Sequence, residues 1–138
     1  MPLYPYTNPP WRFFGGGWEE LLALCDSFST DKIGICWDFG HAHTAALDIP
    51  EAFESIGDKL KITHVHDNYR NGDHHHLPAL GSLEWGCIDW KKTMQALAKI
   101  SYNGPLALEL IFPPAPIVES FIRCGYDCLD YLKSLARL

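Results

Sequence analysis

The chain has 138 residues, of which 47% are hydrophobic and 20% are charged, as is usual for one globular domain. The net charge of −6, with only 11 scattered Lys and Arg residues, argues against a nucleic-acid partner, because phosphate binding needs clustered cations. No apolar run approaches the roughly 20 residues that span a bilayer, and the first residues lack the pattern of a signal peptide. Five cysteines without CxxC spacing suit a reducing compartment. We therefore expect a cytoplasmic protein without membrane or nucleic-acid partners.

The first half of the chain predicts a loop followed by a helix, a strand and a second helix. Residues 1–17 contain four prolines and three glycines, which predicts an irregular loop. Apolar residues recur at helical spacing over 18–28. The short apolar run 33–37, flanked by charges, is typical of a buried parallel strand. The segment 49–56 predicts a helix, because an Asp precedes it and a Pro lies in its first turn.

The second half continues the same alternation. Residues 62–65 predict a strand, and a long loop rich in Asn, Gly, His and Pro extends from there to about residue 89. A helix over 90–100, a strand over 106–110 and a helix over 117–135 complete the chain. Strands that alternate with helices indicate right-handed βαβ units. We expect an α/β fold with three parallel strands and about four helices.

Three strands are few for a parallel sheet, which normally has both faces covered and its edges protected. We therefore expect the chain to form part of a larger unit. An apolar inner face of Ile33, Ile35, Ile62 and Leu106 would then be exposed together with both outer strands. An exposed patch of this size usually marks an interface, so we expect a homo-oligomer.

Each predicted strand ends near a side chain of a metal-binding type. Asp38 follows the first strand, His64 lies near the end of the second, and Glu109 lies in the third. Functional groups of parallel α/β folds sit at the C-terminal ends of strands, and neighbouring strands are about 4.8 Å apart. The three side chains can therefore reach one ion, and a mixed His and carboxylate set suits Mn, Mg, Co or Zn. The alternatives are a helix cap for Asp38 and a core histidine for His64, whereas an unpaired Glu109 between leucines would be costly.

The long loop holds a second group of polar side chains. Its members are Asp67, Asn68, Arg70, Asp73 and the three consecutive histidines at 74–76. They could bind a second ion or a polar substrate, or the loop could be solvated and flexible. The sequence favours neither alternative over the other.

Several motifs together resemble the xylose isomerase-like barrel family, which includes sugar phosphate isomerases, sugar epimerases and endonuclease IV. The resemblance covers nearly the whole chain. The segments that carry it are Trp18–Leu22, Asp38–His41, His64–Asn68, Asp73–His75, Ile88–Trp90 and Ser101–Glu109. It implies a partial (β/α)8 TIM barrel, in which residues 1–138 form a single C-terminal portion.

The resemblance also implies roles for particular residues. Asp38, His64 and Glu109 would be ligands of one divalent ion, and Glu109 would also act as an acid/base group. His41 would act beside the substrate, and His41, His66 and Arg70 would bind a small sugar or sugar phosphate. The implied reaction is isomerisation or epimerisation by proton transfer through an enediolate.

Two alternative functions remain open. His41, Asp73 and His75 match an additional metal site of the endonuclease branch, which implies a metal-dependent nuclease, although most relatives carry part of this pattern without that activity. The other alternative is a non-catalytic barrel fragment that self-associates. The missing strands of such a fragment would leave its sheet edges open.

The sequence departs from the family pattern in two places. The longer segment 80–87 replaces a Gly-x-Gly motif before Ile88–Trp90. The family's first metal ligand is a Glu on the strand before the helix at Trp18, and the chain starts just after that point. We therefore expect the divalent metal to bind weakly or not at all, and the activity to be weak or absent.

Overall fold

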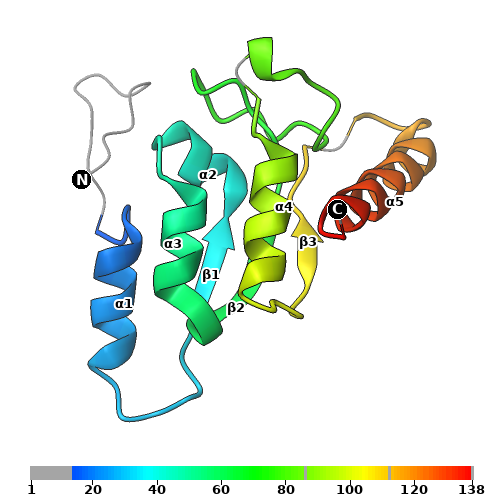
Figure 1. The fold of residues 1–138 in the computed structure, drawn as a ribbon. Coiled ribbons are helices and arrows are strands. Elements are labelled where there is room, and N and C mark those ends of the chain that lie inside the picture. Colours follow the sequence, from blue (N-terminus) through cyan, green and yellow to red (C-terminus); the bar gives the residue numbers. More distant parts are fainter. Residues whose placement is uncertain (1–13, 86, 112, 138) are drawn as a thin grey trace.

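The computed structural model describes three stretches of the chain, residues 14–85, 87–111 and 113–137. The irregular loop expected over 1–17 therefore lies almost entirely outside the described residues. Three parallel strands form one sheet in the order β1-β2-β3 (Figure 1). The strands are β1 (Ile35–Asp38), β2 (Leu60–Val65) and β3 (Leu106–Leu108). The expected parallel α/β arrangement is confirmed.

Five α-helices occur in the described part of the chain, one more than the sequence predicts. They are α1 (Trp18–Asp26), α2 (Phe39–Thr44), α3 (Ile49–Ile56), α4 (Trp90–Lys99) and α5 (Val118–Leu135). Two 3-10 turns accompany them, η1 (Gly57–Lys59) and η2 (Leu83–Trp85). The additional helix is α2, which directly follows β1 and has Asp38 as its N-cap. Its six residues are too few to show helical periodicity, and they include a glycine.

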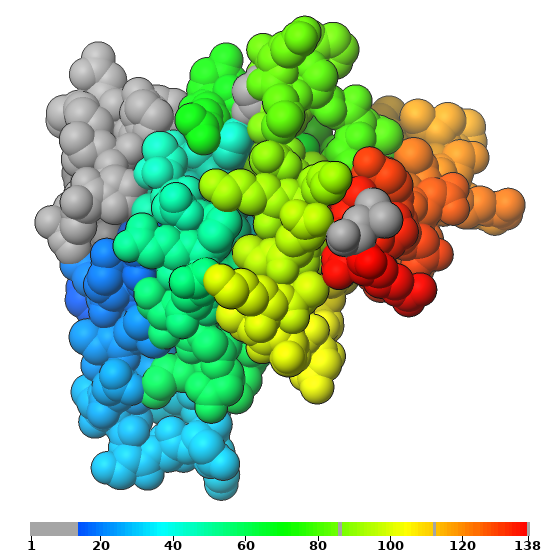
Figure 2. Space-filling model, in the orientation of Figure 1, coloured from blue at the N-terminus to red at the C-terminus, as the bar shows by residue number. Residues whose placement is uncertain are grey.

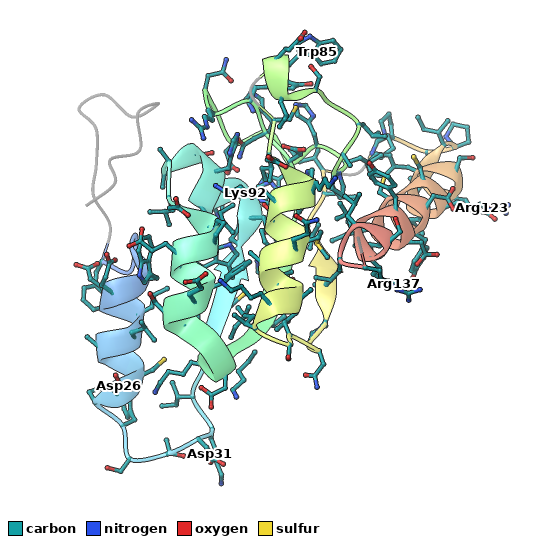
Figure 3. All side chains as sticks on the ribbon, in the orientation of Figure 1. Asp26, Asp31, Trp85, Lys92, Arg123 and Arg137 are labelled. Carbon is teal, nitrogen blue, oxygen red and sulfur yellow. The ribbon has the colours of Figure 1, made fainter. Side chains whose placement is uncertain are left out.

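The helices α1, α3 and α4 cover one face of the sheet, and α5 packs beside α4 (Figures 1 and 2). Aromatic rings fill this layer. The ring of Phe53 on α3 meets Trp37 of β1 edge-on at a centroid distance of 5.2 Å and Phe39 at 5.9 Å. Charged side chains such as Asp31 and Arg123 lie at the outer ends of the molecule (Figure 3). None of the described helices is long and apolar enough to cross a membrane.

The two faces of the sheet are assigned by the strand register. Trp37 pairs with Thr63, and Thr63 with Leu106, and Trp37 and Thr63 are buried against the helices. The neighbouring row, in which Asp38 pairs with His64, faces away from the helices, because successive side chains of a strand point to opposite faces.

The expected inner apolar face is therefore partly wrong. Ile35 is 3% exposed and packs in the core, and Leu106 shares the helix-covered row, whereas Ile62 lies on the open face with 37% of its surface exposed. Ile33 precedes β1. The cause is a shift in the pairing register between Ile35 and Cys36, which a pattern of apolar residues does not reveal.

Asp67, just after β2, holds the long loop in place. Its side chain is 1% exposed, and its Oδ1 accepts hydrogen bonds from the backbone N–H of Asn68 (2.8 Å) and of Ile88 (3.0 Å). Its Oδ2 accepts a bond of 2.7 Å from the indole Nε1 of Trp90. The backbone of Asp67 also forms a two-bond bridge with His76. The start and the end of the loop are thereby tied to one carboxylate.

We expect Asp67→Asn to lower the free energy of unfolding by about 1–3 kcal/mol. The new amide NH₂ group would face the indole N–H of Trp90, and both of these donors would lack an acceptor. Trp90→Phe removes the opposing donor, so Asp67→Asn should cost less in a Trp90→Phe background. Urea unfolding of the single and double variants measures this coupling. Strictly additive effects of the two substitutions would contradict the assigned contact.

Candidate metal centre

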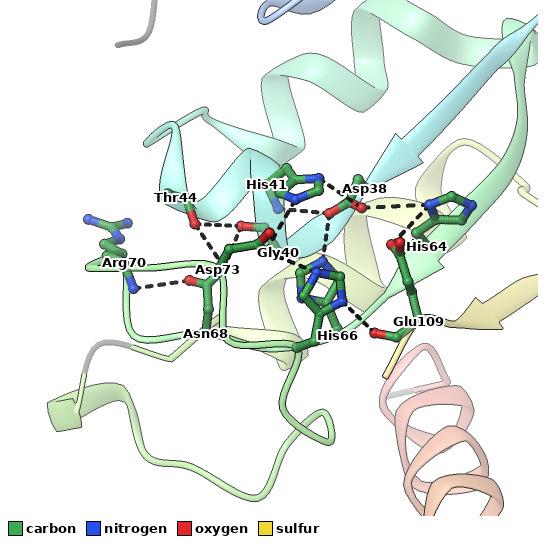
Figure 4. A network of polar contacts seen from close by, with 11 residues as sticks. Asp38, Gly40, His41, Thr44, His64, His66, Asn68, Arg70, Asp73 and Glu109 are labelled. Carbon is green, nitrogen blue, oxygen red and sulfur yellow. Dashed lines mark hydrogen bonds and ion pairs between the residues drawn. The ribbon is translucent and has the colours of Figure 1, made fainter. Parts of the chain in front are cut away.

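The three strand-end side chains meet at one point on the open face of the sheet. Asp38 ends β1, His64 lies in β2, and Glu109 follows β3, where its backbone N–H donates to the carbonyl of Val65. Each offers one ligand atom, and these atoms lie within 4.8 Å of one another (Figure 4). The Nδ1 of His64 lies 3.6 Å from Oδ2 of Asp38 and 3.1 Å from Oε2 of Glu109.

Asp38 is the most highly connected residue of this cluster. Its Oδ1 accepts the backbone N–H of His41 at 2.7 Å and lies 3.0 Å from Nε2 of His66. Its Oδ2 lies 3.0 Å from Nδ1 of His41. Burial acts to raise the pKa of Asp38, but the hydrogen bonds from His41 and His66 outweigh it and hold this pKa well below its usual range. Asp38 thus caps α2 and also presents a charged carboxylate at the strand end.

The residues present fit a divalent cation. Two carboxylates and one imidazole are a usual ligand set for Mn, Co or Zn. Within the described residues the Oε2 of Glu109 makes no well-aligned hydrogen bond, and its polar contact is the ion pair of 3.1 Å with Nδ1 of His64. A cation at the centre of the cluster would give this oxygen a ligand bond.

A second cluster of donor groups lies next to the first. It consists of His41, His66, Asp73 and His75, whose ligand atoms also lie within 4.8 Å of one another. The Oδ1 of Asp73 is 3.3 Å from Nε2 of His41 and 3.0 Å from Nε2 of His75. The loop histidine His75 is fixed further by a contact of 2.9 Å between its Nδ1 and the carbonyl of Glu109.

The loop is therefore not a uniformly solvated segment. His74 and His76 stack on each other with a centroid distance of 5.1 Å and flank Tyr69, so they are separated from the donor cluster that contains His75. Asn68 is fully buried, and its Nδ2 donates to the carbonyl of Gly40 at 2.6 Å. Its position in the His64–Asn68 motif is thus explained by a contact between the loop and α2.

Two residues expected to contact substrate are not accessible from the cluster of Asp38, His64 and Glu109. His66 has no exposed surface, so direct contact with a substrate would require it to move. Arg70 is exposed and lines a separate cavity of about 530 Å³ together with His43 and Lys92. Figure 4 shows Arg70 on the far side of Asp73 from Glu109.

The hydrogen bond to Asp38 raises the pKa of His41 to about 9 from 6.5, against the opposing effect of burial. In the metal-free protein we expect His41 to remain protonated through neutral pH. Its contribution to stability should be complete below pH 6.5, the pKa of the unfolded chain, and should disappear as the pH rises towards 9.

NMR titration of the imidazole signals tests this expectation. Asp38→Asn should move the His41 midpoint back towards 6.5, since it removes the charged partner. A wild-type midpoint already near 6.5 would contradict the assigned pair.

Polar side chains at the C-terminal ends of successive parallel strands are the arrangement found in (β/α)8 barrels. Comparison with known sequences identifies the family, because residues 5–124 match the xylose isomerase-like TIM barrel family. The chain belongs to this family.

Three relatives illustrate the range within the family. An uncharacterized protein of Sinorhizobium fredii is 36% identical over 86 residues, which is 62% of this chain and 26% of that protein. Mannonate dehydratase of Oceanobacillus iheyensis is 28% identical over 77% of this chain and 32% of its own. D-psicose 3-epimerase of Enterocloster bolteae is 25% identical over 86% of this chain and 36% of its own. The chain spans only about a third of the length of these relatives.

Solved structures show the same fold. A crystal structure of D-psicose 3-epimerase in the presence of D-fructose superimposes with a TM-score of 0.67 at 14% identity, over 88% of this chain and 44% of that one. A structure of L-ribulose 3-epimerase superimposes with a TM-score of 0.56 at 21% identity, over 88% of this chain and 39% of that one. The three strands and their helices therefore correspond to part of a TIM barrel, as the sequence predicts.

Proposed function

We propose that the chain is part of a divalent-metal-dependent isomerase or epimerase acting on a small sugar or sugar phosphate. The observation that carries the proposal is the convergence of Asp38, His64 and Glu109 within 4.8 Å at the ends of three successive strands. The structural relatives are named for the 3-epimerisation of D-psicose and of L-ribulose, which supports this reaction class.

In this proposal Asp38, His64 and Glu109 hold the ion, which would be Mn, Mg, Co or Zn. The bound ion would polarise the carbonyl and hydroxyl oxygens of the sugar. Glu109 removes the proton from the carbon next to the sugar carbonyl and returns it, while the imidazole of His41 donates a hydrogen bond to a substrate oxygen. Arg70 and His66 remain proposed substrate-binding residues because of the family pattern. Both side chains would have to move towards the metal cluster when a sugar binds.

The second cluster would hold a further ion through His41, Asp73 and His75. Its presence makes a metal-dependent phosphodiesterase, as in the nuclease branch of the family, the second candidate function. The net charge of −6 opposes a nucleic-acid substrate. Mn²⁺-dependent cleavage of a duplex with an abasic site, lost in Asp73→Asn, would favour this candidate over the sugar enzyme.

We further propose a cytoplasmic homo-oligomer. All five cysteines are free, as suits a reducing compartment, and the open face of the sheet offers a surface for a second copy.

Within the described residues Glu109 is the single glutamate at the metal cluster. A second acid/base group on the opposite face of the sugar contributes about 10²–10⁴ in rate, so we expect weak activity.

Proton exchange without inversion tests this function, because one base can remove and return a proton from the same face. We expect the chain with Mn²⁺ in D₂O to introduce deuterium next to the carbonyl of a ketose or ketose phosphate, without forming the epimer. Proton NMR of a panel of such sugars measures the exchange. Glu109→Gln is the matched control, and an exchange rate equal to that of this variant for every sugar would refute the proposal.

A further inference from the structure

His66 occupies an unusual position for a residue next to a metal cluster. Its side chain has no exposed surface, and its ring fills the space over Gly40. A Cβ added to Gly40 would lie 1.9 Å from the His66 Cε1, so only glycine admits the ring there. On the other side the ring of His75 stacks in parallel, with a centroid distance of 3.9 Å and an interplanar angle of 5°. The ring is therefore held in one plane.

This packing fixes what each ring nitrogen of His66 does. Nε2 lies 3.0 Å from Oδ1 of Asp38, whereas Nδ1 is buried without a hydrogen-bond partner in the described residues. An ionised carboxylate only accepts hydrogen bonds. Nε2 must therefore carry a proton and donate a hydrogen bond to Oδ1 of Asp38.

The consequence concerns the two oxygens of Asp38. Oδ1 receives two donors, the Nε2–H of His66 and the backbone N–H of His41 at the start of α2. Oδ2 lies 3.0 Å from Nδ1 of His41 and 3.6 Å from Nδ1 of His64, so a metal ion bound to Oδ2 would take the place of its contact with His41. The two oxygens of Asp38 therefore differ: Oδ1 already accepts two N–H groups, and Oδ2 is the oxygen that can bind a metal ion.

We infer that His66 is a positioning residue, which reserves Oδ2 of Asp38 for the metal ion by binding Oδ1. This inference rests on the proposed function in that it assumes a metal at Asp38, His64 and Glu109. Partners of this kind orient a ligand and increase its affinity for the metal without touching the ion, and their loss costs roughly 10- to 100-fold in metal affinity. His66 then has a role that does not require contact with the sugar.

Calorimetric titration with Mn²⁺ tests the inference on the full chain. His66→Leu, which keeps the bulk and removes the donor, should weaken binding by roughly 10- to 100-fold. His66→Gln, whose amide can still donate to Oδ1, should restore most of the affinity. Unchanged affinity in His66→Leu, or equal losses in Leu and Gln variants of equal thermal stability, would overturn it.

Gly40 gives an independent way to move the ring. Gly40→Ala should weaken Mn²⁺ binding as His66→Leu does, because the new methyl group displaces the ring. Combined with His66→Ala, which leaves room for that methyl group, Gly40→Ala should add no further loss. Additive losses in this cycle would show that Gly40 acts through something other than His66.

A measurement without metal separates this inference from the proposed function. ¹⁵N NMR of the histidine ring nitrogens in the metal-free chain should show Nε2 of His66 protonated, and the signal should shift in Asp38→Ala. If the wild type binds no Mn²⁺, the proposed function fails while this spectrum still decides the hydrogen bond. An unprotonated Nε2 in the wild type would overturn the inference whatever the metal does.

Discussion

Asp38→Asn and Glu109→Gln are each expected to reduce Mn²⁺ affinity by more than the roughly 10- to 100-fold that the loss of an outer partner costs. Each substitution removes one of two anionic ligands, and the described residues offer no other carboxylate to this cluster. In the wild type we expect a dissociation constant above about 1 μM, because three protein ligands leave the ion partly solvated. This corresponds to a standard binding free energy less favourable than roughly −8 kcal/mol.

Titration of the wild type and these variants with Mn²⁺, Co²⁺ and Zn²⁺ measures the effect. Glu84→Gln is the matched control, because Glu84 is an exposed glutamate on η2 in the long loop, away from the strand ends. Asp73→Asn distinguishes the two clusters and should leave this affinity within the same order of magnitude. Equal affinity in the wild type, Asp38→Asn and Glu109→Gln would show that the cluster is not a metal site.

Self-association is the second large effect that we expect. The face of the sheet opposite the helices carries the exposed Ile62, and α5 exposes Ile122, Tyr126 and Tyr131. The outer edges of β1 and β3 pair with no other described strand. Exposed apolar patches and free strand edges drive association, so at low micromolar concentration the chain should form dimers or larger assemblies.

Light scattering coupled to gel filtration measures the mass across a concentration series. Ile62→Lys should shift the equilibrium towards the monomer, because it places a charge in the centre of the open face. Leu83→Lys makes a similar change on the loop and should leave the mass unchanged. A single species of 15.6 kDa with cooperative unfolding would mean that the chain needs no second copy.

The order of strands and helices could be predicted because each element carries a local signal. The helix over 49–56 begins and ends as expected, since an N-cap, a first-turn proline and an apolar face coincide there. The face of Ile62 in β2 is predicted wrongly for a non-local reason. Between Ile35 and Cys36 the pairing steps from Leu60 to Ile62, and a single strand does not contain the information on how it pairs with its neighbour.

The convergence of the three strand-end side chains also follows from the sequence, because equivalent positions of parallel strands meet at one edge of the sheet. The buried position of His66 does not. The spacing does predict on which side of the sheet His66 lies. His64 and His66 are two residues apart, so strand alternation places both on the same side as Asp38. The packing of the His66 ring over Gly40 brings together segments 26 residues apart, which no local pattern predicts.

The most direct test of the account is the anomalous diffraction of a crystal of this chain soaked in Mn²⁺. We expect a peak at about 2.0–2.2 Å from Oδ2 of Asp38, from the imidazole of His64 and from the carboxylate of Glu109. We also expect Oδ1 of Asp38 to keep its contacts with His66 and with the backbone N–H of His41. A peak only among His41, Asp73 and His75, or none at the strand ends in a saturating soak, would contradict it.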